Sequence, residues 1–260
     1  MRPDELAYLR CPRCRGALLA DAAAVRCPAC ASVFPVEGGV PRFLIDPSER
    51  VRRHIAALDA DMRRHHWVVA KMSLAAFMWL PAERVRLLRA LDIRPGQTVL
   101  DHCTGPGSNL PALAAALGPT GHLVGMDLSG LVLEQAAAML RQKGIAADLH
   151  QADALALPYA DATFDAVVHY GALNQFGPDT RTAIDEIFRV TRPGGLVVLL
   201  DEGIVERRRD TWWGRLLIWG NPLFGFRPPL ELLPAGTTPA VRWVMRGMFY
   251  EVQLRKPGAT

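Results

Sequence analysis

The chain has 260 residues, half of them hydrophobic, so its length allows one large domain and a smaller one. No apolar run approaches the ~20 residues that a membrane-spanning helix needs, and the first residues carry no secretory apolar segment, so we expect a cytoplasmic protein without a transmembrane segment. The net charge of +4 is uneven, because residues 95–200 are acidic and both flanks are basic. Basic flanks could face RNA or an anionic surface, or arginine could simply be the solubilising residue of this chain.

Four cysteines near the N-terminus have the spacing C-x2-C-x12-C-x2-C. They are Cys11, Cys14, Cys27 and Cys30, and each pair encloses a proline-containing turn that can direct both sulfurs to one point. Four thiolates form a closed tetrahedral zinc site, which is structural rather than catalytic. Disulfides are the alternative, but they are rare in the cytosol. The pattern predicts a small zinc-binding domain over residues 1–45, whose folding would depend on the metal.

Residues 46–94 are expected to form a helical linker that covers the substrate site. A helix start is predicted at residues 46–49, and residues 83–91 have the pattern of an amphipathic helix. The basic run between them could contact phosphates or form a solvated helix face. It includes His65 and His66, which have no acidic or cysteine partner at a spacing suited to a metal site.

A glycine-rich turn follows a predicted strand and precedes a predicted helix. Asp101 ends the strand, and Gly105 and Gly107 allow the backbone to approach a ligand closely. A dinucleotide site has glycine at the position of Leu110, and a carboxylate before the turn would repel a pyrophosphate but could hold an ammonium group. S-adenosylmethionine (SAM) has an ammonium group, a carboxylate and no phosphate, so it is the expected cofactor. Cys103, within the turn, is expected to be a small packed residue.

Two later acidic residues suit the remaining parts of SAM. Asp127 ends the next predicted strand, twenty residues after Gly107, and could accept hydrogen bonds from both ribose hydroxyls. Capping of the next helix is the alternative for Asp127, although Ser129 already suits that role. Asp153 follows a third strand and could accept from the adenine amino group, while the N–H of Ala154 donates to the ring.

The predicted elements alternate between strands and helices, as in an α/β doubly wound sheet. Strands are expected at residues 98–100, 122–126, 147–150, 163–169 and 196–200, helices at 111–117, 131–143 and 180–190, a turn at 191–195, and closing antiparallel strands at 242–245 and 248–254. The pieces V-L-D-H-C-T-G-P-G, G-M-D-L-S and I-F-R-V-T-R-P-G-G resemble the motifs of class I SAM-dependent methyltransferases. They are most similar to the ubiquinone/menaquinone C-methyltransferases and the general small-molecule (type 11) group. The resemblance implies a Rossmann-like, seven-stranded methyltransferase sheet over residues 95–260.

The motifs and this resemblance together point to the site residues. The expected cofactor contacts are Asp101, Gly105, Gly107, Asn109, Asp127, Leu128, Asp153, Ala154 and His169. The resemblance places His169 beside the transferred methyl group, and it is the first candidate for a general base because an unperturbed imidazole titrates near working pH. Tyr170 is the second catalytic candidate, followed by Asp201 and Glu202. A packing role beside the cofactor is the alternative for His169.

A second resemblance concerns the N-terminal segment. The runs L-R-C-P-R-C-R-G-A-L-L and R-C-P-A-C-A-S-V-F-P-V-E-G-G-V-P-R-F-L are similar to small zinc ribbons that activate tRNA and translation-factor methyltransferases. A four-cysteine ribbon also precedes the methyltransferase domain of bacterial 23S rRNA guanine-N1 methyltransferases. An rRNA or tRNA base methyltransferase that recognises RNA through the ribbon is therefore the alternative function. The run H-Y-G-A-L-N after the fourth strand lacks the Asn/Asp-Pro-Pro-Tyr signature, which argues against N6-adenine or N4-cytosine chemistry but not against guanine N1.

Residues 203–236 are expected to form a tryptophan-rich cap over the substrate pocket. Three of the six tryptophans lie there, and such a cap suits a flat, apolar or prenylated acceptor, with a basic edge that could touch lipid headgroups. The same aromatic residues could stack on unpaired RNA bases, or could simply pack on the sheet. The favoured function is methyl transfer from SAM to a small apolar or aromatic acceptor, such as a lipid, quinone or secondary metabolite. The ribbon could then be a structural lid or a homodimer contact, and a non-enzymatic protein that docks another methyltransferase is a third hypothesis.

Overall fold

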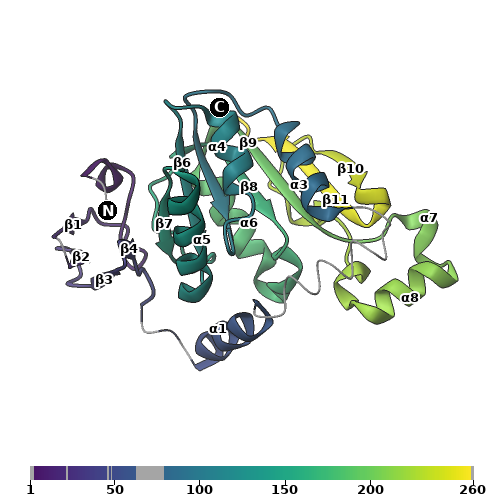
Figure 1. The fold of residues 1–260 in the computed structure, drawn as a ribbon, viewed down its shortest axis with the longest axis horizontal. Coiled ribbons are helices and arrows are strands. Elements are labelled where there is room, and N and C mark those ends of the chain that lie inside the picture. The colour runs from purple at the N-terminus through teal and green to yellow at the C-terminus, as the bar shows by residue number, and fades with distance from the viewer. Residues whose placement is uncertain (1–2, 22, 46, 48, 63–78, 259–260) are drawn as a thin grey trace.

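A computed structural model describes residues 3–21, 23–45, 47, 49–62 and 79–258 (Figure 1). Its centre is a seven-stranded sheet with the order β10-β11-β9-β8-β5-β6-β7. The strands are β5 (Thr98–His102), β6 (His122–Asp127), β7 (Asp148–Gln151), β8 (Phe164–Tyr170), β9 (Thr191–Glu202), β10 (Ala240–Val244) and β11 (Phe249–Arg255). Strands β5 to β9 are parallel to one another, whereas β11 runs antiparallel to β9 and β10. The predicted α/β fold is therefore confirmed, while the basic run with His65 and His66 lies outside the described residues.

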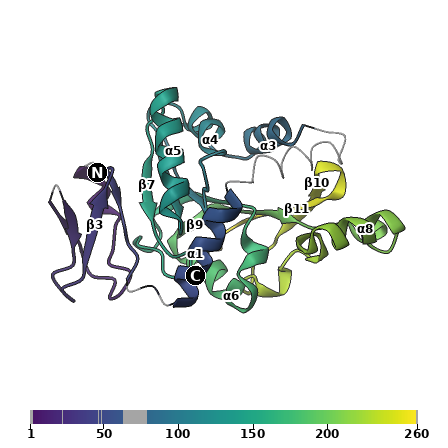
Figure 2. The same cartoon turned by 60° about the horizontal axis from the view of Figure 1, so that its bottom comes forward.

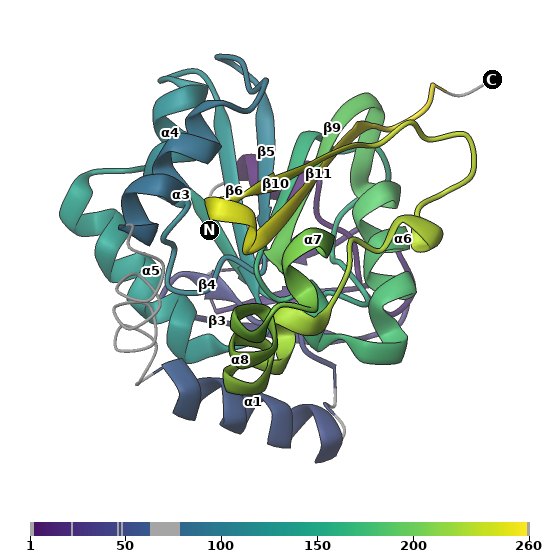
Figure 3. The ribbon, with the colours of Figure 1, turned by 90° about the vertical axis from the view of Figure 1, so that its right-hand side faces the viewer.

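Helices cover both faces of the sheet (Figure 3). The described helices are α1 (Glu49–Met62), α3 (Leu80–Arg89), α4 (Leu110–Leu117), α5 (Gly130–Lys143), α6 (Thr180–Val190), α7 (Glu206–Arg209) and α8 (Trp212–Gly220). Helices α3, α4 and α5 share an apolar cluster with Val168, whereas α6 shares another with Val167. These valines are neighbours in β8, and the period-two alternation of a strand sends their side chains to opposite faces.

Most expected boundaries agree with the structure to within a few residues. The helix predicted over residues 180–190 is α6, and the helix predicted from residue 131 begins at Gly130, where the Ser129 hydroxyl accepts a hydrogen bond from the Val132 N–H (3.3 Å). The turn predicted at 191–195 is wrong as a separate element, because β9 already starts at Thr191. Phe164 pairs with Thr191 and the next pair joins Ala166 to Leu196, so β9 accommodates these residues as a bulge.

The N-terminal segment packs against the outer edge of the large sheet. Its strands β1 (Leu19–Ala20), β2 (Ala24–Arg26), β3 (Val33–Glu37) and β4 (Val40–Pro41) form a four-stranded antiparallel sheet, which Figure 2 shows beside β7. The Phe43 N–H donates to the Gln151 carbonyl at the end of β7 (2.7 Å), and the Ala160 N–H donates to the Tyr8 carbonyl (2.8 Å). Phe43 is buried in the same apolar cluster as the core of the large sheet. The segment thus covers the edge strand, which would otherwise expose unpaired backbone groups.

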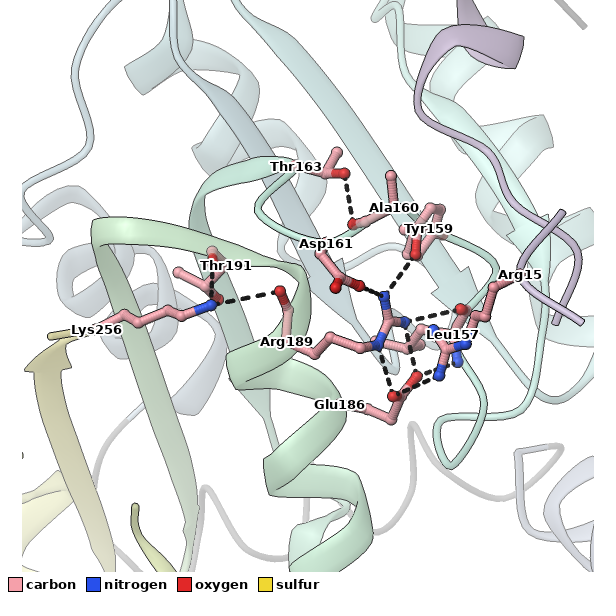
Figure 4. Close-up of polar contacts among 10 residues, drawn as sticks. All are labelled: Arg15, Leu157, Tyr159, Ala160, Asp161, Thr163, Glu186, Arg189, Thr191 and Lys256. Atoms are coloured by element: carbon pink, nitrogen blue, oxygen red, sulfur yellow. Dashed lines mark hydrogen bonds and ion pairs between the residues drawn. The ribbon is translucent and has the colours of Figure 1, made fainter. Parts of the chain in front are cut away.

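A cluster of ion pairs also attaches this segment to helix α6 (Figure 4). Arg189 of α6 donates to the carbonyls of Leu157 (3.1 Å) and Tyr159 (2.7 Å), in the loop before β8. Its guanidinium also contacts Glu186 (2.7 Å), and Arg15 from the cysteine-rich segment donates to the same carboxylate (2.9 Å). Because Glu186 is largely buried, these two arginines hold its pKa below the usual range despite the cost of burial.

The segment between β9 and β10, which we call the cap, was predicted to cover a substrate pocket, and that role stays a prediction. It contains α7, α8 and short 3-10 turns, and it lies at the end of the molecule opposite the cysteine-rich segment (Figure 1). Gly214 of α8 is buried against α7, where a Cβ would lie only 1.9 Å from the Arg208 carbonyl oxygen. Among the described residues, none of the helices is long and apolar enough to cross a membrane.

Candidate functional site

The candidate cofactor site lies where the strand order of the sheet reverses. The chain leaves β5 toward β6 on one side and later returns to β8 on the other side, which separates the loops at the carboxyl ends of β5 and β8. The loop after β5 has positive φ angles at Gly105 (+56°) and Gly107 (+82°). A Cβ on Gly107 would lie 2.9 Å from the Met139 Cε and 3.1 Å from the Ala136 Cβ of α5, so the turn requires glycine both for its conformation and for its packing.

Asp101 stabilises the loop after β5 through two side-chain hydrogen bonds. Its carboxylate is fully buried and accepts hydrogen bonds from the Thr104 hydroxyl (2.5 Å) and the Asn109 side-chain amide (2.9 Å). Burial raises the pKa of Asp101 to about 6, which the two donors partly oppose. In this structure Asp101 therefore orders the loop directly, and Asn109, expected as a cofactor contact, is one of its two partners. The contact of Asp101 with an ammonium group stays a prediction.

Asp127 joins the loops that follow β5 and β6. Its carboxylate accepts hydrogen bonds from the N–H groups of Gly105 (2.9 Å) and Ser129 (3.0 Å). Burial raises its pKa, and these backbone donors counteract the shift. Ser129, and not the Asp127 side chain, caps the N-terminus of α5, whereas Asp127 connects the two loops. The ribose contact of Asp127 stays a prediction. Leu128 follows, half-buried, and its carbonyl accepts from the Gln151 side-chain amide (2.9 Å).

Asp153 and Ala154 lie in the loop after β7, next to the Asp127 loop. The Ala152 N–H donates to the Asp127 carbonyl (3.0 Å), which connects the two loops. Asp153 is half-buried and accepts from the Leu155 N–H (2.9 Å), whereas Ala154 is buried. The structure therefore brings the predicted contacts from three successive loops to the same edge of the sheet, where SAM is expected.

Arg42 is a neighbour of this site that the sequence did not reveal. Its side chain comes from the cysteine-rich segment and donates to the Gln151 side-chain carbonyl (3.2 Å), and Gln151 in turn contacts the Leu128 carbonyl. Its guanidinium lies against the start of α5, where a Cβ on Gly130 would be 2.4 Å from the Arg42 Nη1. The sequence gives no indication that Arg42 lies near the cofactor site, because only tertiary packing places it beside Gln151 and the start of α5.

The structure corrects the reason for choosing His169 as a general base. His169 is fully buried in β8, and its Nδ1 lies 2.7 Å from the Nδ1 of His102 in β5. Burial lowers the pKa of each imidazole to about 3, so both rings are neutral near pH 7. The expectation that His169 titrates near working pH is therefore wrong. Among the described residues, the Nε2 atoms of both rings have no hydrogen-bond partner. His102 was not anticipated, since its role depends on the pairing of β5 with β8.

Tyr170, the second catalytic candidate, ends β8 beside the cap. The Arg84 guanidinium lies 4.2 Å from its ring centroid, and burial raises the pKa of its hydroxyl to about 12. Asp201, at the end of β9, is buried and accepts hydrogen bonds from the N–H groups of Ala172 (3.2 Å) and Asn174 (2.9 Å). Burial and the neighbouring carboxylate raise the pKa of Glu202. The structure thus provides neutral hydrogen-bonding groups, and no base with a pKa near 7, at Tyr170 and His169.

The four cysteines of the N-terminal motif converge on one point. Their sulfur atoms all lie within 4.8 Å of one another, with 3.6 Å between Cys11 and Cys30 and 3.4 Å between Cys14 and Cys27. A tetrahedral site with Zn–S bonds of about 2.3 Å separates its sulfurs by about 3.8 Å, close to these distances. None of these four cysteines forms a disulfide.

A second group of side chains, His102, Cys103 and His169, has its ring nitrogens and sulfur within 4.8 Å of one another. Cys103 therefore contacts an imidazole, at 3.5 Å from the His102 Nδ1, as well as packing in the turn.

Comparison with known proteins shows the class of domain to which this fold belongs. A family model described as a methyltransferase domain matches residues 99–195. An uncharacterized protein of Mycobacterium tuberculosis is 31% identical over 199 residues, which cover 76% of this chain and 66% of that protein. The demethylmenaquinone methyltransferase of Halalkalibacterium halodurans is 37% identical over 136 residues, covering 50% of this chain and 53% of that enzyme.

The fold has counterparts among solved structures. A SAM-dependent methyltransferase from Aquifex aeolicus matches with a TM-score of 0.52 and 20% identity, over 67% of this chain and 89% of that chain. The chain spans between about half and two thirds of the length of the two curated relatives above. Residues 99–195 are therefore a methyltransferase domain, and the chain has the fold of the SAM-dependent methyltransferases.

Proposed function

We propose that this protein transfers a methyl group from SAM to a small, apolar or aromatic acceptor. The observation that carries the proposal is the methyltransferase domain at residues 99–195, in which the loops after β5, β6 and β7 meet around Asp101, Asp127 and Asp153. SAM supplies an electrophilic methyl group, and the protein supplies proximity and alignment. The proposed cofactor contacts remain those expected from the sequence: Asp101, Gly105, Gly107, Asn109, Asp127, Leu128, Asp153, Ala154 and His169.

Asp127 is the central residue of this proposal. A carboxylate has several lone pairs, so Asp127 can accept from Gly105 and Ser129 and still accept from the two hydroxyls of a ribose. Asp101 contributes by fixing the glycine loop through Thr104 and Asn109. Both carboxylates therefore shape the site before a ligand binds, which reduces the ordering that binding requires.

The chemical class of the acceptor is inferred from the side chains that pack around Tyr170. Tyr170 lies in an apolar cluster with Phe224 of the cap and with Met245 and Met248, between β10 and β11. These buried side chains favour an apolar acceptor, and demethylmenaquinone methyltransferases among the relatives support a quinone-like one. His169 and Tyr170 are proposed to position the acceptor as neutral groups. An acceptor with an acidic proton fits this site better than an alcohol, because neither residue is a strong base at pH 7.

We also propose that Cys11, Cys14, Cys27 and Cys30 hold a structural zinc ion. The sulfur distances suit a tetrahedral ZnS4 site, and all four positions are filled by protein, which leaves no open position for catalysis. The metal would stabilise the segment that covers β7 and presents Arg42 to Gln151. Zinc content, measured on protein purified without added metal, tests this: one zinc per chain is expected, and a protein without zinc or any other bound metal would contradict it.

The reaction is tested by incubating the protein with methyl-tritiated SAM and a cell extract, then separating solvent-extractable material from RNA. Label in the organic phase is expected. Label in RNA would instead support the rRNA or tRNA methyltransferase alternative. Asp127→Ala should abolish the labelling, whereas Asp185→Ala, at an exposed position on α6, is the matched control and should retain it. Absence of both labelling and SAM binding would refute the proposal.

A further inference from the structure

The surface of the cap carries an unusual concentration of exposed apolar side chains. Ten large hydrophobic side chains are exposed in the described part of the chain, and six of them lie between Trp212 and Leu230. Trp212 and Trp219 are 75% and 83% exposed, and Leu216 lies between them. Their spacing of four and three residues places these three on one side of α8. We call Trp212, Leu216 and Trp219 the tryptophan face.

The opposite side of α8 is anchored to the protein, so the tryptophan face points away from it. Gly214 is buried against α7, and the Thr211 hydroxyl caps the helix by accepting from the Gly214 N–H (3.1 Å). Leu217 and Ile218 pack against the apolar cluster that contains Tyr170. Figure 1 shows α7 and α8 at the outer end of the molecule, away from the cysteine-rich segment. The exposed tryptophans therefore do not pack in the core, although exposing their large apolar surface to water is unfavourable.

Arginines lie at one edge of this face and on the neighbouring helix α7. Arg215 follows Trp212 by three residues and precedes Trp219 by four, so it lies along the edge of the tryptophan face. Arg207 and Arg208 are exposed on α7, which packs against α8. Within the described residues these three arginines form no ion pair, although the Arg208 Nη1 donates to the Arg246 carbonyl (2.8 Å). Arg227 of the same segment, in contrast, pairs with Glu206 (2.7 Å). Residues 203–229 contain five arginines and two acidic residues, so the cap is a cationic surface.

We propose that the tryptophan face docks on an anionic lipid bilayer, with the indole and leucine side chains at the level of the headgroups and the arginines beside the lipid phosphates. A helix with an apolar face, a basic flank and too little length to span a membrane is suited to lie in the interface. Tryptophan suits this depth because its ring is apolar and its N–H is polar. Docking would place the cap beside the bilayer, which is where an apolar acceptor of the proposed reaction would be dissolved. The docking itself does not depend on that reaction.

Single-stranded RNA is the competing partner for exposed tryptophans beside arginines. RNA recognition needs aromatic planes on which bases stack and polar groups that read the base edges. Leu216, at the centre of the tryptophan face, offers neither, and Phe226 and Leu230 extend the surface with further apolar area. Lipid is thus the better match, and RNA binding becomes an outcome of the test.

The test uses the full chain without SAM or acceptor, so that its result is independent of methyl transfer. Protein is sedimented with vesicles of phosphatidylcholine plus phosphatidylglycerol and with vesicles of phosphatidylcholine alone, and tryptophan fluorescence is recorded. We expect binding to the anionic vesicles with a blue shift of emission. The Trp212→Ser/Trp219→Ser variant should bind at least about tenfold more weakly. Trp79→Ser is the matched control, because Trp79 is 65% exposed and lies outside the cap, just before α3, and it should bind as the unmodified chain does.

A charge series separates lipid headgroup attraction from apolar insertion. Each basic residue near an anionic surface contributes a factor of about five, so replacing Arg207, Arg208 and Arg215 by Gln should weaken binding about a hundredfold. The matched control replaces three exposed residues on the other helices, Arg89, Arg141 and Lys143, by Gln. Failure to sediment with anionic vesicles, equal binding by the double tryptophan variant, or binding to single-stranded RNA in place of vesicles would each overturn the proposal. Unchanged methyl transfer from SAM in any of these cases would leave the proposed reaction intact.

Discussion

The paired imidazoles of His102 and His169 predict a specific sensitivity of the fold to acid. Burial lowers both pKa values to about 3, whereas a histidine in the unfolded chain has a pKa near 6.5. Between these values the unfolded chain binds more protons than the folded one, so the free energy of unfolding falls as the pH falls below 6.5. For one such histidine the loss between pH 7.5 and pH 5 is about 2 kcal/mol, and for the pair it is about 4 kcal/mol.

Urea denaturation at pH 7.5, 6.5, 5.5 and 5.0 measures this loss, and a variant isolates the histidine contribution. His102→Asn keeps a hydrogen-bonding group opposite the Nδ1 of His169 but removes one titrating ring. We expect the variant to be less stable at every pH and to lose about 2 kcal/mol less than the unmodified chain over the same range. His54→Asn, on the exposed side of α1, is the matched control and should keep the full loss. Carboxylates common to all three proteins cancel in the comparison, so equal losses in the unmodified chain and His102→Asn would refute the reasoning.

Three further predictions concern the cofactor site, the metal and the attachment of the N-terminal segment. Asp127→Ala removes the acceptor of two backbone N–H groups and of the two proposed ribose hydrogen bonds. SAM binding should weaken at least about 100-fold, because each hydrogen bond to a charged group contributes roughly 1.5–3 kcal/mol, and unchanged affinity by calorimetry would exclude the proposed role. Cys14→Ser should release zinc to a chelator at concentrations that leave the unmodified chain loaded, with proteolysis starting in residues 1–45; equal retention would argue against a four-thiolate site. Glu186→Gln breaks the ion pairs with Arg15 and Arg189 and should lower the melting temperature by about 5 °C, for a loss of roughly 2 kcal/mol; an unchanged melting curve would show that the pairs contribute little.

Local sequence patterns predicted the parts of the fold that depend on local physics. Alternation and apolar content located the parallel strands, and Ser129 and Gly144 delimit α5 through a side-chain cap and a left-handed residue at its C-terminus. The Gly105–Gly107 turn was recognisable because a positive φ and close packing both require glycine. The turn expected at 191–195 failed for the opposite reason: its proline and glycines suggest a break, but pairing with β8 keeps these residues in the strand as a bulge.

The sequence by itself determined the cysteine quartet and the loop after β5, since these features depend on residue types at fixed spacing. Only the tertiary structure decided how His169 behaves, because its pKa depends on burial and on His102, which lies 67 positions earlier in the chain. The structure also decided that the cysteine-rich segment covers β7 and brings Arg42 to Gln151. Contacts between distant segments set burial and charge environment, and these quantities cannot be read from the residues of one segment.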